Sequence, residues 1–237
     1  MTRRACPDVG GIVTTVVEEI FTAVHEVEAD AVRMLDAVRS RRAVPGGADV
    51  SRLGPGIRAL LARTQLVVGL GLIVAPGLLD DEQLRLEWWQ RGGAGDAPTA
   101  LDVDLNRLSP GFYDYEAAEW FAVPRQSGAR HVVGPYVDVH GTGSYMLTFT
   151  VPVSWDGAFV GVAGADVPAA RFEERLLDRL STAAPSVLLN RDDRVVFSSS
   201  ARWLTGSRMA PADAAGQLEL GDVPAVPWRW GTPSRNH

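Results

Sequence analysis

The segment that decides the fold begins FYDYEAAEWFAVP at residues 112–124. It continues as three apolar, alternating runs: HVVGPYVDVH at 131–140, SYMLTFTVPVS at 144–154 and AFVGVAGAD at 158–166. The short connections GTG at 141–143 and WDG at 155–157 are typical of hairpin turns. The segment therefore predicts an antiparallel meander.

The middle run has two different faces. One set of alternate residues is apolar and the other is mixed: Tyr145, Leu147, Phe149 and Val151 against Met146, Thr148, Thr150 and Pro152. Alternate residues of a strand point to opposite faces of its sheet. We expect a sheet that is covered on one face and carries polar and aromatic groups on the other, where a small ligand can bind.

Composition indicates a soluble globular protein with one large domain, or one domain and a smaller unit. The chain has 237 residues, is 46% hydrophobic and carries a formal charge of -6. This acidity disfavours direct binding to nucleic acid or to an anionic membrane surface, because both depend on clustered cations.

The rarer residue types limit the chemistry and the compartment. All 23 cationic residues are arginine, so a lysine Schiff base or a P-loop lysine is impossible. Cys6 is the single cysteine, which excludes an intrachain disulfide and suits a reducing compartment. The apolar run 65–79 is too short to span a bilayer, and no export signal is evident. We expect a cytoplasmic location without membrane contact.

A long amphipathic helix is predicted near the N-terminus. Apolar residues occupy positions 13, 17, 20, 24, 27, 31, 35 and 38, which is nearly a heptad spacing. Such a narrow seam either lies along its own domain or pairs with a second copy. We expect a homodimer through this helix, because the seam would otherwise stay half exposed.

Other elements follow from local patterns. We expect helices at 51–63, 110–121 and 168–180, the second closed by Pro124, and hairpins formed by 66–74 with 84–90 and by 186–189 with 194–198. The Gly- and Pro-rich segment 201–237 is predicted to be irregular or part of a truncated unit. The domain assignment is a tail and helix at 1–48, a ligand-binding domain at 49–182 and a second unit at 183–237.

Catalytic and metal motifs are missing from the sequence. It contains no HExxH, GxSxG or phosphate-binding glycine loop. Asp138 and His140 share one side of a strand, but no third ligand stands at a recognisable spacing, so we expect no metal and no cofactor.

Aromatic rings and carboxylates are concentrated around the meander instead. Rings on a mixed face either belong to the core or line a site. A carboxylate among rings needs a cation, and a ligand ammonium would provide one through cation–π contacts and hydrogen bonds. The residues concerned are Tyr113, Tyr115, Trp120, Phe121, Tyr136, Tyr145, Asp138 and Asp166.

The order of these pieces resembles the Cache superfamily, the PAS-like sensor domains of bacterial receptors. The resemblance covers about Val13–Leu180 and rests on WFAVP at 120–124, GPYVD at 134–138, TVPV at 150–153 and DGAFVGVAGAD at 156–166. The hairpin 187–198 followed by WLTG at 203–206 resembles the start of the smaller unit in double Cache domains. The implied fold is α+β: a PAS-like antiparallel sheet with a long N-terminal helix and a short second unit.

The resemblance also implies site residues. By position, the ligand-binding residues are Tyr113, Trp120, Phe121, Tyr136, Asp138 and Asp166. The arginine that pairs with the α-carboxylate in amino-acid-binding members is replaced by Ala118. A ligand carboxylate would then face acidic residues without a counter-charge. We therefore expect an amine ligand rather than an α-amino acid.

Three classes of function stay open. A sensor of this kind would act in signalling or transcriptional regulation through a separate regulator protein. A non-catalytic dimeric scaffold would fill the pocket with its own side chains. An enzyme on a PAS-like fold would need a polar triad or a metal that the sequence does not offer.

Overall fold

A computed structural model describes residues 8–93, 96–137, 145–180, 186–209, 218–223 and 226–233. The chain divides into two compact units. The larger unit comprises Ile20–Val133 and Thr148–Val167, and the smaller unit comprises Met1–Glu19, Gly134–Leu147 and Pro168–His237. Each unit is described separately below.

The predicted N-terminal helix is present as α1, Val9–Ser40. All eight residues of its apolar seam are buried within the chain, and none is more than 2% exposed. The physical reason for expecting a second copy was a half-exposed seam. That reason is absent, because the seam packs inside the chain itself.

The meander is confirmed as part of a six-stranded sheet in the order β3-β2-β1-β6-β5-β4. The predicted hairpin of β1 and β2 is antiparallel and pairs Gly71 with Trp88. The strands are β1 Gly69–Val74, β2 Leu86–Gln90, β3 Thr99–Ala100, β4 His131–Val137, β5 Tyr145–Trp155 and β6 Ala158–Pro168.

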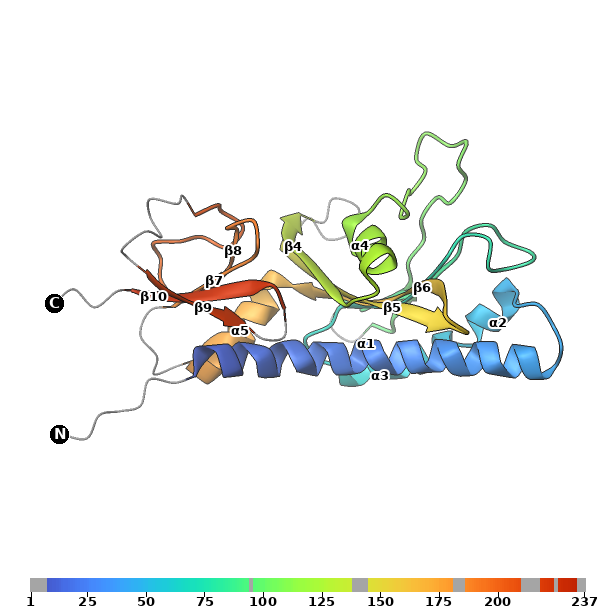
Figure 1. Ribbon diagram of the computed structural model, residues 1–237, viewed down its shortest axis with the longest axis horizontal. Coiled ribbons are helices and arrows are strands. Elements are labelled where there is room, and N and C mark those ends of the chain that lie inside the picture. Colours follow the sequence, from blue (N-terminus) through green and yellow to red (C-terminus); the bar gives the residue numbers. More distant parts are fainter. Residues whose placement is uncertain are drawn as a thin grey trace. The chain divides into compact units, whose positions relative to one another are not determined.

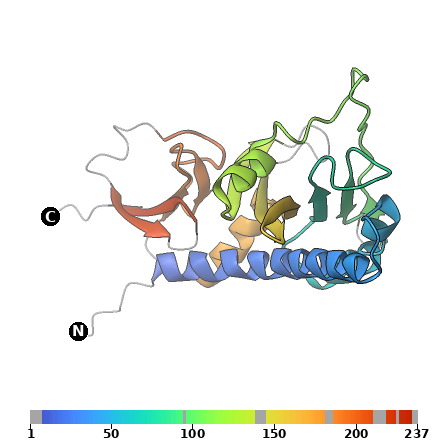
Figure 2. The same ribbon diagram turned by 45° about the vertical axis from the view of Figure 1, so that its right-hand side comes forward.

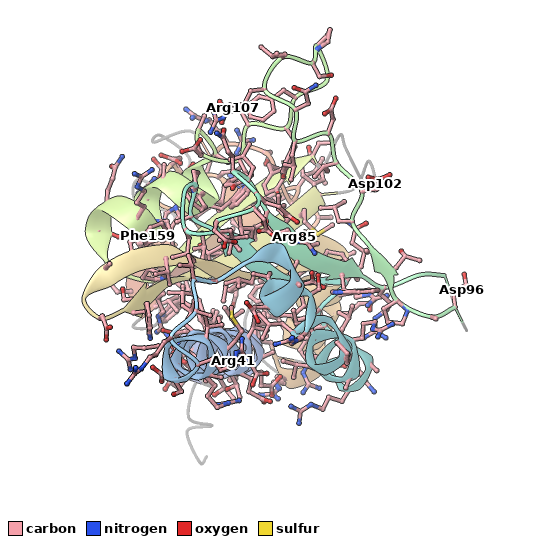
Figure 3. All side chains as sticks on the ribbon, turned by 90° about the vertical axis from the view of Figure 1, so that its right-hand side faces the viewer. Arg41, Arg85, Asp96, Asp102, Arg107 and Phe159 are labelled. Carbon is pink, nitrogen blue, oxygen red and sulfur yellow. The ribbon has the colours of Figure 1, made fainter. Side chains whose placement is uncertain are left out.

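Helices cover both faces of this sheet in the larger unit (Figure 1, Figure 3). On one face, Phe149 of β5 meets Phe21 of α1 edge to face at 5.5 Å. On the other face, Phe121 of α4, Glu119–Ser127, meets Phe159 of β6 at 5.5 Å. The expected apolar face is therefore the α1 face, and the mixed face lies under α4.

Two predicted helices have different boundaries in the structure. The helix expected at 110–121 is wrong, because α4 begins at Glu119 and continues through Pro124. Phe121 and Pro124 are both buried, so packing of this helix outweighs the hydrogen bond that proline cannot donate. The helix expected at 51–63 is divided into α2, Gly47–Ser51, and α3, Gly54–Arg63.

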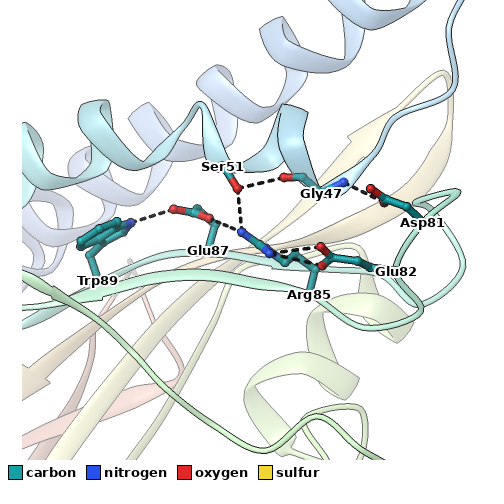
Figure 4. A network of polar contacts seen from close by, with 7 residues as sticks. All are labelled: Gly47, Ser51, Asp81, Glu82, Arg85, Glu87 and Trp89. Carbon is teal, nitrogen blue, oxygen red and sulfur yellow. Dashed lines mark hydrogen bonds and ion pairs between the residues drawn. The ribbon is translucent and has the colours of Figure 1, made fainter.

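A polar network joins α2 to β2 (Figure 4). Arg85 lies 3.0 Å from the Glu87 carboxylate and donates a 2.8 Å hydrogen bond to Ser51. The indole of Trp89 donates to the same carboxylate at 2.8 Å. Glu87 is only 6% exposed, so its charge depends on these partners.

We expect Glu87→Gln to lower the free energy of unfolding by about 1.5–3 kcal/mol, the usual contribution of a charge-assisted hydrogen bond. The amide would still accept from Trp89 but would leave Arg85 without its buried counter-charge. Glu82→Gln is the matched control, because Glu82 contacts the same arginine at 3.3 Å from a more exposed position. It should cost less than about 1 kcal/mol. Urea denaturation measures both, and equal losses would contradict the assignment.

The smaller unit contains a four-stranded sheet in the order β8-β7-β10-β9. The predicted hairpin is confirmed as antiparallel β7 and β8. Two interpretations of 201–237 were open: irregular structure is wrong where β9 and β10 form a second antiparallel pair (Figure 2), whereas membership of a second unit agrees with their place in this sheet. Phe172 of α5 packs on Trp228 of β10 at 5.8 Å, which anchors that helix. The elements are α5 Ala169–Leu180, β7 Val187–Leu189, β8 Val195–Ser198, β9 Leu218–Val223 and β10 Trp228–Pro233.

Candidate ligand-binding site

The pairing of β1 with β6 shows which residues share the sheet face that α4 covers in the larger unit. Ile73 pairs with Val162, two residues further Gly71 pairs with Gly164, and then Gly69 pairs with Asp166. Residues two apart in a strand share a face, so these pairs form one row. Asp166 stands four residues beyond Val162, about 13 Å along the strand at 3.3 Å per residue.

The Ile73 and Val162 end of this row is filled by aromatic core. Phe121 is fully buried and lies 5.2 Å from the ring of Tyr115, edge to face. The Tyr115 hydroxyl donates a 2.9 Å hydrogen bond to the Val74 carbonyl. We assign Phe121 to the core, because rings of this chain surround it on several sides.

The Asp166 end is more polar. Asp166 is half-buried, and the hydroxyl of Thr148 donates a 2.6 Å hydrogen bond to its Oδ1. A methyl group added to Gly69 would lie 3.0 Å from Asp166 Oδ2 and 2.9 Å from Trp88 Nε1. Gly69 is therefore the small residue that lets the carboxylate and the indole approach the same point of the sheet.

Trp88 lies close to both ends of this row of paired residues. It is 6% exposed and belongs to the buried cluster with Tyr115 and Phe121. Its Nε1 is buried, and none of the residues that the structure describes offers it a hydrogen-bond acceptor. The sequence-based site omitted Trp88. Two features of the sequence could have indicated Trp88. It shares one face of its strand with Leu84 and Leu86, and the neighbouring strand has glycines at alternate positions.

The sequence-predicted site residues are distributed as follows. Tyr113 and Trp120 are half-buried and pack against the aromatic cluster of Phe121, while Asp166 lies further along the row. Tyr136 is half-buried and belongs to the smaller unit. Asp138 lies outside the described residues, as does His140. Within the described ranges, no three His, Cys, Asp or Glu side chains lie close enough together to hold a metal ion.

Burial raises the pKa of Tyr115 to about 12, whereas an unfolded tyrosine titrates near 10. The unfolded chain therefore loses this proton first. The stabilisation that Tyr115 contributes is complete below about pH 10 and is lost as the pH rises towards 12.

We expect wild type to exceed Tyr115→Phe in stability by about 1 kcal/mol at pH 8, because the variant lacks the hydrogen bond to Val74. The difference should shrink at pH 11, since only the wild-type chain has this ionisable group. Urea denaturation at both pH values measures the difference. A constant difference would show that Tyr115 ionises equally in both states.

Known proteins share this architecture. No family model matches the chain. The methyl-accepting chemotaxis protein TlpQ of Pseudomonas aeruginosa is 27% identical in a match over 129 residues, which covers 47% of this chain and 18% of that receptor. The chain therefore spans less than a fifth of the length of this curated relative.

Solved structures match over nearly the whole chain. The ligand-binding domain of the amino acid chemoreceptor PctC of Pseudomonas aeruginosa, in complex with GABA, is 14% identical, with a TM-score of 0.62 and coverage of 95% of both chains. The extracellular domain of a candidate histidine kinase is 13% identical, with a TM-score of 0.65 and coverage of 95% of this chain and 94% of that one.

These matches bear on location and fold. Among the helices that the structure describes, none combines the length and the hydropathy needed to cross a membrane. The expected cytoplasmic location has no support, because solved neighbours are extracellular domains. The resemblance is confirmed at the level of architecture: this chain has the α+β fold of the Cache-type, PAS-like ligand-binding domains of chemoreceptors and histidine kinases.

Proposed function

We propose that the chain is a sensor domain whose larger unit binds the ammonium group of a small amine at Asp166. The observation that carries this proposal is the half-buried Asp166 carboxylate, whose Oδ1 accepts the 2.6 Å hydrogen bond from Thr148 while Oδ2 lies beside Gly69. A carboxylate held in one orientation can accept hydrogen bonds from a protonated amine without further ordering. The solved neighbours, which are named as ligand-binding domains, support a sensor role.

Ala118 supports an amine without a carboxylate. It is the N-cap residue of α4 and stands where amino-acid-binding relatives of this fold class are expected to carry arginine. An α-carboxylate near Asp166 would meet a like charge, and desolvating it without a guanidinium costs several kcal/mol. Ligand contacts by Tyr136 and Asp138 stay a prediction.

Butylamine and GABA form a matched pair of test ligands. They have the same ammonium and the same three methylene groups, but butylamine ends in a methyl group where GABA ends in a carboxylate. We expect isothermal titration calorimetry to show saturable binding of butylamine and at least tenfold weaker binding of GABA. Glycine and alanine serve as plain α-amino acids in the same panel.

Two outcomes would overturn the proposal. Tighter binding of GABA or alanine than of butylamine would show that a carboxylate is recognised, and the amine preference would be wrong. A failure of the whole panel to bind would favour the non-catalytic scaffold, whose pocket is filled by its own side chains. The buried ring of Phe121 is the observation that favours that second candidate.

Signal output would pass to a separate regulator protein. A ligand shifts a conformational equilibrium only by its difference in affinity for the two states, so the partner must contact a surface that differs between them. A homodimer through α1 would have to use the polar faces of that helix, because its apolar seam is buried. Sedimentation velocity with and without butylamine measures whether the state of association follows the ligand.

A further inference from the structure

A hollow of about 490 Å³ lies in the smaller unit. Its walls come from α5, from the end of β8 and from the segment that follows β8. The volume falls in the range of about 300–1,000 Å³ that is usual for small-molecule sites. The residues that matter for its chemistry are Glu173, Leu177, Trp203, Leu204 and Thr205.

The apolar part of this hollow is open to solvent. Leu177 is 42% exposed and Leu204 is 71% exposed, which places them among the few large apolar side chains that the described residues leave exposed. Both line the same hollow, together with the half-buried Trp203. Apolar surface gathered around a concavity is typical of a binding site, whereas single exposed leucines are not.

The polar part is one carboxylate. Glu173 is half-buried and hydrogen-bonded to Thr205, and it forms no ion pair with any part of the chain that the structure describes. Burial raises the pKa of Glu173, and the neighbouring Glu174 raises it further, while the hydrogen bond with Thr205 lowers it. Arg202 stacks on the ring of Trp203, which lines the hollow, at 5.3 Å.

We propose that this hollow is a second binding site, which takes an organic cation with an apolar body, such as an alkylammonium ion. The ammonium pairs with Glu173, and the alkyl chain covers Leu177 and Leu204. Charge complementarity selects the cation, because a carboxylate that is partly withdrawn from water gains most from a partner of opposite charge. The alkyl chain contributes affinity by removing the leucine surface from water. This site does not depend on ligand binding at Asp166.

Hexylamine is the probe that tests this site in the full chain. We expect a saturable shift of the Trp203 indole N–H resonance in ¹H–¹⁵N spectra, with that resonance assigned from the Trp203→Phe variant. Glu173→Gln should weaken this binding at least tenfold, because the amide keeps the bond with Thr205 but not the charge. Glu174→Gln is the matched control: the same substitution on the exposed neighbouring residue should change the affinity less than twofold.

Two further comparisons separate this site from the first one. Asp166→Asn should leave the hexylamine shift at Trp203 unchanged, whatever its effect on binding in the larger unit. Hexan-1-ol, which has the same chain without the charge, should bind more weakly and should not distinguish Glu173→Gln from wild type. The proposal is overturned if hexylamine gives no saturable shift at Trp203, or if Glu173→Gln binds it as well as wild type does.

Discussion

Asp166→Asn is expected to bind butylamine about 10- to 100-fold more weakly than wild type, because the variant loses a charge-assisted hydrogen bond of about 1.5–3 kcal/mol. The asparagine side chain has the same shape and can still accept from Thr148. The loss therefore reports the charge rather than the packing. Isothermal titration calorimetry at neutral pH measures it directly.

Asp156→Asn is the control for this prediction. Asp156 pairs with Arg39 at 2.6 Å, and its side chain is 60% exposed at the turn between β5 and β6. The same change of charge at that turn should leave butylamine affinity unchanged. Thr148→Val adds a second test, because removing the hydroxyl that holds Oδ1 should give a smaller loss than Asp166→Asn. Equal affinity of wild type and Asp166→Asn would place the amine elsewhere.

Phe149→Ala is expected to lower the free energy of unfolding by about 3–5 kcal/mol, the usual cost of removing a buried aromatic ring. Phe149 is fully buried, and its ring meets Phe21 of α1 at 5.5 Å. The substitution would leave a cavity between the sheet and α1. Urea denaturation followed by far-ultraviolet circular dichroism measures the shift of the transition.

Leu108→Ala is the matched control in the same unit. Leu108 is 93% exposed, so truncating it should change the free energy of unfolding by less than about 0.5 kcal/mol. A small effect of Phe149→Ala, similar to that of Leu108→Ala, would contradict the packing of β5 on α1. It would also reopen the assignment of the seam of α1 to the interior of its own chain.

Local patterns in the sequence were sufficient for most of the architecture. The alternation in residues 145–152 separates an apolar from a mixed face, and β5 packs its apolar face on α1. The seam of α1 was equally clear, since its spacing is long and regular. Such patterns depend only on the period of a helix or strand, which a single segment contains in full.

The candidate site needed information that no single segment contains. Asp166, Phe121 and Tyr113 were expected to lie together around one ligand. The register of β1 with β6 instead places Val162 against the aromatic cluster and Asp166 four residues further along. Trp88 reaches the Gly69 and Asp166 end from β2, which the order of residues in the chain does not indicate.

The sequence by itself determined which residues share a face, because side-chain direction follows from backbone period. Only the tertiary structure decided what covers each face: α1 buries its own seam, α4 extends through Pro124, and β9 and β10 complete a sheet from a Gly- and Pro-rich segment. The physical reason is that burial of apolar surface is non-directional and joins segments far apart in the chain. Long-range packing can therefore outweigh local preference at a proline, and it alone brings Trp88 to Asp166.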